Sequence, residues 1–180
     1  MMAGMSRCPR SAPPCDSLTA RILHEPFRVF FPWALVAGCV GVALWPLFLT
    51  GKLPFYPGAA HARLMIEGLL GAFALGFLGT AAPRMIESPP LGRGWVVFFL
   101  LMHAGLVVAH ATGRVGWGDA LFAALWGLWL GVMVWKWATQ RQDSPPAGAV
   151  AVLGGLLCGV AGAGALAAGA DTSGTWMAYR

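Results

Sequence analysis

Five apolar stretches, each long enough to cross a lipid bilayer, constrain this chain more than any other feature. They cover residues 30–50, 62–82, 95–112, 118–138 and 147–170. A helix needs about 20 apolar residues, at about 1.5 Å each, to span the hydrocarbon core. Glycines and prolines separate the stretches, and we expect Pro83, which lacks a backbone donor, to end the second helix. The sequence therefore predicts an all-α integral membrane bundle of about five transmembrane helices.

The composition supports lipid as the solvent of this chain. Of its 180 residues, 58% are hydrophobic and only 11% are charged, whereas a soluble domain carries about 25% charged residues. The net charge of +5 would suit nucleic acid, but the charges lie in short loops rather than on one face. We therefore expect the lipid bilayer as the partner of this surface, and no nucleic acid.

Lysine and arginine predict the orientation of the chain. We place the transmembrane domain at residues 28–172, between an N-terminal tail (1–27) that we expect to be disordered and a short C-terminal tail (173–180). The N-terminal tail lacks the apolar run of a signal peptide. Eight of the twelve basic residues fall in or next to this tail, the second loop and the fourth loop: Arg7, Arg10, Arg21, Arg28, Arg84, Arg93, Lys136 and Arg141. The positive-inside rule then predicts a bacterial inner-membrane protein with a cytoplasmic N-terminus and a periplasmic C-terminus.

Sequence motifs of soluble enzymes are not recognisable. The pattern shows no nucleophile beside a base, no phosphate-binding glycine loop and no cysteine cluster with metal-ligand spacing. Cys8 and Cys15 lie in the tail, and Cys39 and Cys158 lie in apolar segments, so we expect inert, reduced thiols. These observations argue against an enzyme.

The ionisable residues inside the apolar stretches are the best functional candidates. They are Arg63, Glu67, His103 and His110, with His61 at the edge of the second stretch. An ionisable group at the centre of a membrane helix costs about 2.5–3.5 kcal/mol on insertion scales, so it usually has a partner and a purpose. We group Arg63 and Glu67 with Arg84 as a polar core.

Helical geometry predicts two layers of these side chains. His103 and His110 are seven residues apart, so they share one face of the third helix at a separation of about 10 Å. The second and third helices are antiparallel neighbours, because a short loop joins them. We therefore expect His61 to meet His110 in an outer layer, and Glu67 to meet His103 in a deeper one.

Facing imidazoles on neighbouring helices predict a cofactor site. Neutral imidazole is a good ligand of haem iron and of copper, so we take His61, His103 and His110 as ligands of a b-type haem, of copper, or of both. Met65, one turn from His61, adds a soft ligand, so that His61, Met65 and His110 form a candidate copper site. In the alternative, each histidine bonds a neighbouring backbone or carboxylate, and Arg63 and Glu67 only neutralise charge between helices.

Two helices carry small residues at every fourth position. In the second helix these are Gly68, Ala72, Gly76 and Thr80, and in the fifth Gly155, Gly159, Ala163 and Ala167. Such stripes allow two helix backbones to approach closely. We expect both stripes to serve packing.

Three segments resemble the NnrS family. They are HEPFRVFFPWALVAGCVGVALWPLF (24–48), HARLMIEGLLGAFALGFLGTAAPRM (61–85) and DSPPAGAVAVLGGLLCGVAG (143–162), which contain a PFR entry, a His-led second helix ending in GFLGTAAPR and a proline-led fifth helix. The resemblance implies a haem- and copper-containing membrane protein of the bacterial response to nitric oxide. His61 is the position that best matches a histidine of the family.

Three functions are compatible with these features. The first is an NnrS-like protein that binds haem or copper in the nitric oxide response. The second is a cofactor-free structural or accessory subunit of a larger membrane complex. The third is a half-size permease that forms a homodimer, with Glu67 at its midplane.

Overall fold

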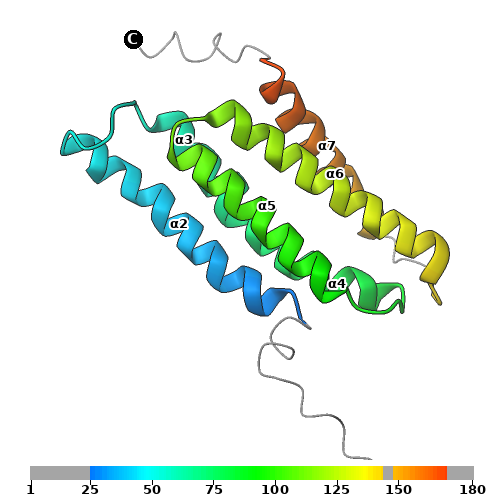
Figure 1. The fold of residues 1–180 in the computed structure, drawn as a ribbon. Helices are drawn as coiled ribbons and strands as arrows, with labels where there is room; N and C mark the ends of the chain where they lie inside the picture. Colours follow the sequence, from blue (N-terminus) through cyan, green and yellow to red (C-terminus); the bar gives the residue numbers. More distant parts are fainter. Residues whose placement is uncertain (1–24, 144–147, 170–180) are drawn as a thin grey trace, which may run out of the picture.

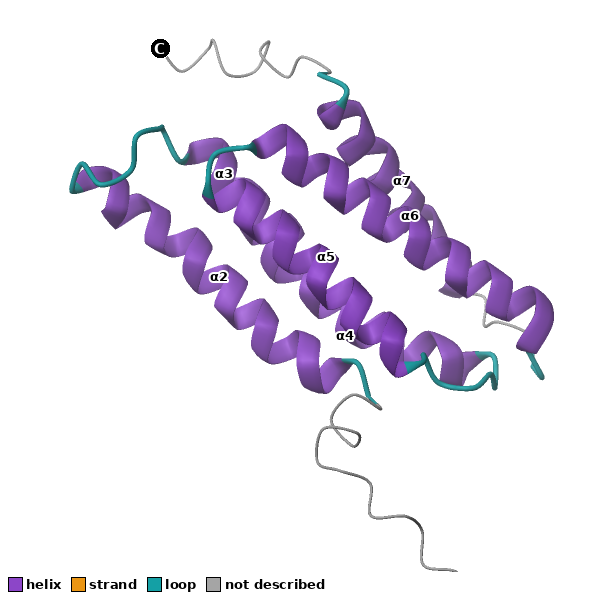
Figure 2. Ribbon diagram, in the orientation of Figure 1, coloured by secondary structure: helices purple, strands orange, loops and turns teal. Residues whose placement is uncertain are grey.

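The computed structural model describes residues 25–143 and 148–169 of the chain. The predictions for Cys8 and Cys15, for most of the N-terminal tail and for the C-terminal tail concern residues outside these ranges. Within them, all regular structure is helical, as Figure 2 shows. The helices are α2 (Phe27–Leu49), α3 (Gly58–Arg63), the π-helix η1 (Leu64–Leu70), α4 (Gly71–Met85), α5 (Arg93–Ala111), α6 (Val115–Gln140) and α7 (Gly148–Ala167).

The predicted membrane bundle is confirmed. Because α3, η1 and α4 form one continuous rod from Gly58 to Met85, the described residues contain five helices long and apolar enough to cross a membrane. The second spanning helix is longer than predicted at both ends, since it begins at Gly58 and α4 continues past Pro83 to Met85. Pro83 removes one backbone hydrogen bond and crowds the carbonyl of Gly79, and the helix ends two residues later, at Met85.

The helices form a slanted bundle with a clear order across it (Figure 1). α2 lies at one edge and packs on the rod formed by α3, η1 and α4. α5 packs on α6. α7 packs on α6 and lies at the other edge. α3 lies at the same end of the bundle as the turn between α5 and α6, and it contacts both of these helices. This arrangement brings three helices together at one end of the bundle.

A π-helical segment interrupts the second spanning helix. The N–H of Gly71 donates to the carbonyl of Ile66, five residues back, instead of four as in an α-helix. Such segments are rare and often mark functional sites. This one contains Glu67, whose side chain is buried.

The small residues of the second spanning helix pack against α2 as predicted. A methyl group added at Gly76 would lie 3.0 Å from Cβ of Phe30 and 3.1 Å from Cα of Phe27, which is tighter than ordinary contact. Thr80 completes the seam, since its Oγ1 accepts a hydrogen bond of 3.3 Å from the backbone N–H of Phe27. The α2 side of the seam also contains a glycine, Gly38. A methyl group there would lie 3.1 Å from Leu69, so a larger residue would crowd the seam.

The corresponding prediction for α7 is wrong for contacts among the described residues. Cβ atoms added at Gly155 and Gly159 would meet nothing within 4 Å, and only Ala163 of this stripe is buried. α7 packs on the core instead through Leu156 and Val160, which share a face with Ala163. The larger side chains therefore decide which face of α7 turns inward.

The two stripes generate a stability prediction. We expect Gly76→Val to lower the free energy of unfolding by about 1–3 kcal/mol, because the seam with α2 has no room for a side chain. Gly155→Val is the matched control, since its site is open. Thermal melting of both variants in one detergent measures the effect. Equal melting temperatures for the two variants would contradict the packing seen at Gly76.

Candidate metal centre

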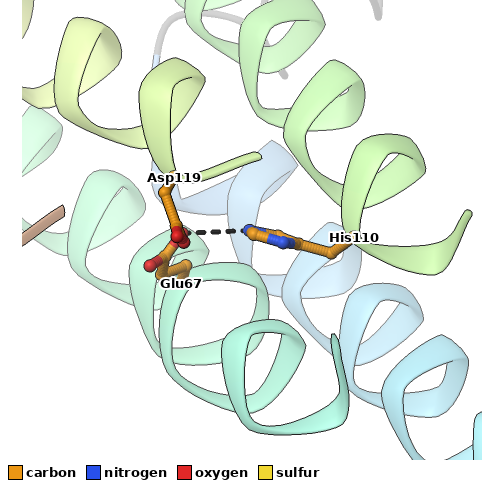
Figure 3. A group of neighbouring side chains, drawn as sticks. All are labelled: Glu67, His110 and Asp119. Carbon is orange, nitrogen blue, oxygen red and sulfur yellow. Dashed lines mark hydrogen bonds and ion pairs between the residues drawn. The ribbon is translucent and has the colours of Figure 1, made fainter. Parts of the chain in front are cut away.

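One imidazole and two carboxylates from three helices converge in the bundle (Figure 3). They are Glu67 on η1, His110 on the last turn of α5 and Asp119, one turn into α6. Relative to full exposure, they are 5%, 0% and 3% accessible. One ligand atom from each lies within 4.8 Å of the other two. His110 Nε2 bonds Oε2 of Glu67 at 3.0 Å.

Arg63 supplies the positive charge for this cluster. Its Nε donates to Oδ1 of Asp119 at 2.7 Å and lies 3.6 Å from Oε1 of Glu67. The two carboxylates therefore share one guanidinium, while the second oxygen of Glu67 faces the imidazole. Two ionised carboxylates this close repel each other, and a cation beside both stabilises them where water is excluded.

A tight turn explains how α5 and α6 bring His110 and Asp119 together. The turn contains Gly113, whose φ of 77° lies in the left-handed region that glycine adopts without strain. One turn into α6, Gly118 lies directly against the His110 ring, and a methyl group there would overlap the ring atoms. The His110 ring therefore occupies the space that a side chain at position 118 would fill, and its bond with Glu67 holds it there. Its Nδ1 is buried, with no hydrogen-bond partner among the described residues.

His103 lies deeper and is fully bonded. The indole N–H of Trp33 donates to Nδ1 of His103 at 2.9 Å, so Nδ1 carries no proton. Nε2 must then carry the proton of the neutral ring, and it donates to the backbone carbonyl of Glu67 at 3.2 Å. Both ring nitrogens are therefore occupied, and the side chain ties α2 and η1 to α5.

His61 presents an open nitrogen. Its Nδ1 lies 2.9 Å from the carbonyl oxygen of Gly41 on α2 and must donate to it, because a carbonyl only accepts. Nε2 is left with a free lone pair and no hydrogen-bond partner in the described part of the chain. Trp45 packs edge-on at 6.0 Å between ring centres. Met65 also lies against Gly41, since its Sδ is 3.3 Å from the position of an added Cβ there.

The pairing of side chains differs from the predicted layers. His61 bonds Gly41 rather than His110, and Glu67 pairs its carboxylate with His110 rather than His103. The reason is the direction of helical side chains, which point toward the N-terminus of their helix. In antiparallel helices Glu67 and His110 therefore reach toward one another along the bundle axis. An argument from the depth of the backbone positions alone places Glu67 and His110 too far apart to bond.

One further residue, Arg84, lies elsewhere than predicted. Arg84 is not in the polar core with Arg63 and Glu67. Its side chain is 66% exposed at the far end of α4, where it bonds Glu25 at 2.8 Å. Glu25 also bonds Arg28 at 2.7 Å, and chiefly this bond lowers the pKa of the Glu25 carboxyl. The exposed pairs close the end of the bundle and contribute little stability.

Asp119 is the member of the cluster that the sequence did not reveal. It is the second residue of the predicted fourth stretch and so was not counted among the intramembrane charges. The available signal was topological, because a turn of three residues after α5 places the start of α6 beside His110. Trp33 was missed as the partner of His103, and no spacing in the sequence indicates that contact.

The fold and the cluster define a polytopic membrane protein with a buried group of residues compatible with metal binding. The family described as NnrS protein matches residues 21–179, and the chain belongs to that family. The predicted resemblance is confirmed. No curated protein and no solved structure matches the chain.

The contact between Gly118 and His110 gives a prediction for the site. We expect Gly118→Ala to displace the imidazole and to lower the free energy of unfolding by about 1–3 kcal/mol, as for an overpacked core. Gly116→Ala, two residues earlier on α6, is the control, because a Cβ added there meets nothing within 4 Å. Thermal melting compares the two. A Gly118→Ala protein as stable as Gly116→Ala would show that the ring is not held there.

Proposed function

We propose that this chain is an NnrS-like protein of the bacterial inner membrane that holds a transition metal and acts in the response to nitric oxide. The observation that carries the metal proposal is the buried convergence of Glu67, His110 and Asp119. The nitric oxide role rests on the family to which the chain belongs. The cytoplasmic N-terminus rests on the distribution of lysine and arginine, and it places the cluster toward the periplasmic side.

A single metal ion fits the donor set of the cluster. Ligands around a first-row ion lie about 2.0–2.2 Å from it, so ligand atoms within 4.8 Å of one another are near the required spacing. Imidazole suits copper, iron and zinc, whereas carboxylates favour harder ions than Cu(I). The cluster therefore favours a divalent ion, with Glu67, His110 and Asp119 as its ligands.

A haem fits the buried histidines poorly. Both ring nitrogens of His103 are bonded, and His110 is enclosed by Gly118 and Glu67, so neither presents a nitrogen to a porphyrin. His61 fits better, because its Nδ1–H is held by a backbone carbonyl and its Nε2 is free. Such a second bond is the usual support of a ligating imidazole. We therefore assign His61 as the ligand of a haem iron, or with Met65 of copper.

The metal proposal predicts a defined pattern of occupancy. Protein purified in detergent should contain about one transition-metal ion per chain in the cluster, and Glu67→Gln or Asp119→Asn should lower its affinity by more than about 100-fold, since each removes a ligand. Elemental analysis after equilibrium dialysis measures this. Trp33→Phe, which changes only the partner of His103, is the control and should retain the metal. Equal metal content in all four proteins would refute the assignment.

The haem proposal is tested separately. A b-type Soret band in the wild-type protein should disappear in His61→Ala and persist in Glu67→Gln. Persistence in His61→Ala would exclude His61 as the ligand.

The biological role is tested in cells. The growth of a deletion strain exposed to nitric oxide should be restored by the wild-type gene and not by the variant that loses the cofactor.

One observation favours a second function. Arg63 already contacts both carboxylates and offsets part of their charge, so the cluster can exist without a metal. This arrangement suits a cofactor-free accessory subunit of a membrane complex. Such a subunit would be free of haem, copper and iron when purified with its complex, and its melting temperature would not respond to added metal.

A further inference from the structure

The position of Arg63 has a consequence for any ion that enters the cluster. Its Nε lies 2.7 Å from Oδ1 of Asp119 and 3.6 Å from Oε1 of Glu67, so it contacts both carboxylates that would bind the metal. A metal ion bound between these carboxylates would be repelled by the guanidinium, because two cations would then lie against the same pair of groups. Arg63 is therefore a competitor of the ion and not a ligand.

The exposures of the side chains show which group can move. The side chain of Arg63 is 23% exposed, whereas those of Glu67 and Asp119 are 7% and 4% exposed. Arg63 is the last residue of α3, near the end of the bundle, and a long arginine stem can carry its charge outward to the interface. The two carboxylates are enclosed by helices on all sides and have no such alternative.

We propose that Arg63 is a displaceable internal cation, which fills the metal position in the metal-free chain and leaves when a divalent ion binds. The inference rests on the proposed function, in which Glu67, His110 and Asp119 hold the metal. Arg63 then keeps the empty site folded and sets the threshold concentration at which an ion occupies it. Because ion binding must break the contacts of the guanidinium with Asp119 and Glu67, the affinity of the wild-type chain is lower than the ligand set alone would give.

Calorimetric titration of the detergent-purified full chain with Zn²⁺, and separately with Cu²⁺, tests this inference. We expect Arg63→Gln to bind at least about tenfold more tightly than the wild type, since glutamine does not compete as a cation. Arg63→Lys keeps the charge and should stay within about threefold of the wild type. Arg84→Gln removes an arginine from the same rod, outside the cluster, and should leave the affinity unchanged.

Melting temperatures provide an independent measurement. Without metal, Arg63→Gln should melt below the wild type, because two buried carboxylates lose their cation. Added Zn²⁺ should raise the melting temperature of Arg63→Gln more than that of the wild type, since a tighter ligand stabilises more. A variant that stays unfolded even with Zn²⁺ present would show that the ion cannot replace the guanidinium, and would overturn the inference.

The remaining outcomes separate this inference from the proposed function. If the wild type binds Zn²⁺ or Cu²⁺ and Arg63→Gln binds equally or more weakly, Arg63 supports the site and the displacement inference fails while the metal site stands. If neither the wild type nor Arg63→Gln binds either ion, both the metal site and the displacement inference are refuted.

Discussion

The structure depends on charge compensation inside a bundle whose outer surface is solvated by lipid. Glu67, Asp119, His110 and Arg63 lie where water is largely excluded, and each oxygen or nitrogen that faces inward needs a partner. The contacts of Arg63 with both carboxylates and the bond between Glu67 and His110 provide such partners, and Nδ1 of His110 is the exception among these described groups. The cluster joins the second, third and fourth spanning helices at one end of the bundle. Lipid gives no hydrophobic driving force between helices, so such polar contacts matter for their association.

The backbone of the second spanning helix serves two requirements at once. Its small residues allow α2 to approach closely along one face, through Gly76 and Gly68. Its π-helical segment carries Glu67, whose side chain bonds His110 and whose carbonyl accepts a bond from His103. A single residue thus links the polar cluster to the deeper histidine. This dual use is consistent with the observation that π-helical segments often occur at functional sites.

The three intramembrane histidines show that residue type alone does not define a role. His103 has a partner on each ring nitrogen and acts as a crosslink between helices. His110 is enclosed and bonded to a carboxylate, which suits a metal ligand within a cluster. His61 alone has a held Nδ1–H and a free Nε2, the arrangement that suits an external cofactor. The difference comes from which backbone carbonyl, indole or carboxylate lies beside each ring.

The sequence by itself determined the membrane bundle and the approximate extent of its five spanning helices, because the length of apolar stretches and the placement of breakers are local properties. Three of its segments indicated the family. The sequence also identified Glu67 and His110 as costly intramembrane groups. The partners of these groups could not be read from it. Asp119, Trp33 and Gly41 become partners only when side-chain direction, a π-helical turn and the docking of α2 are known. Tertiary structure decided the site, since hydrogen bonds between helices depend on rotations and distances of a few ångströms that no spacing along the chain encodes.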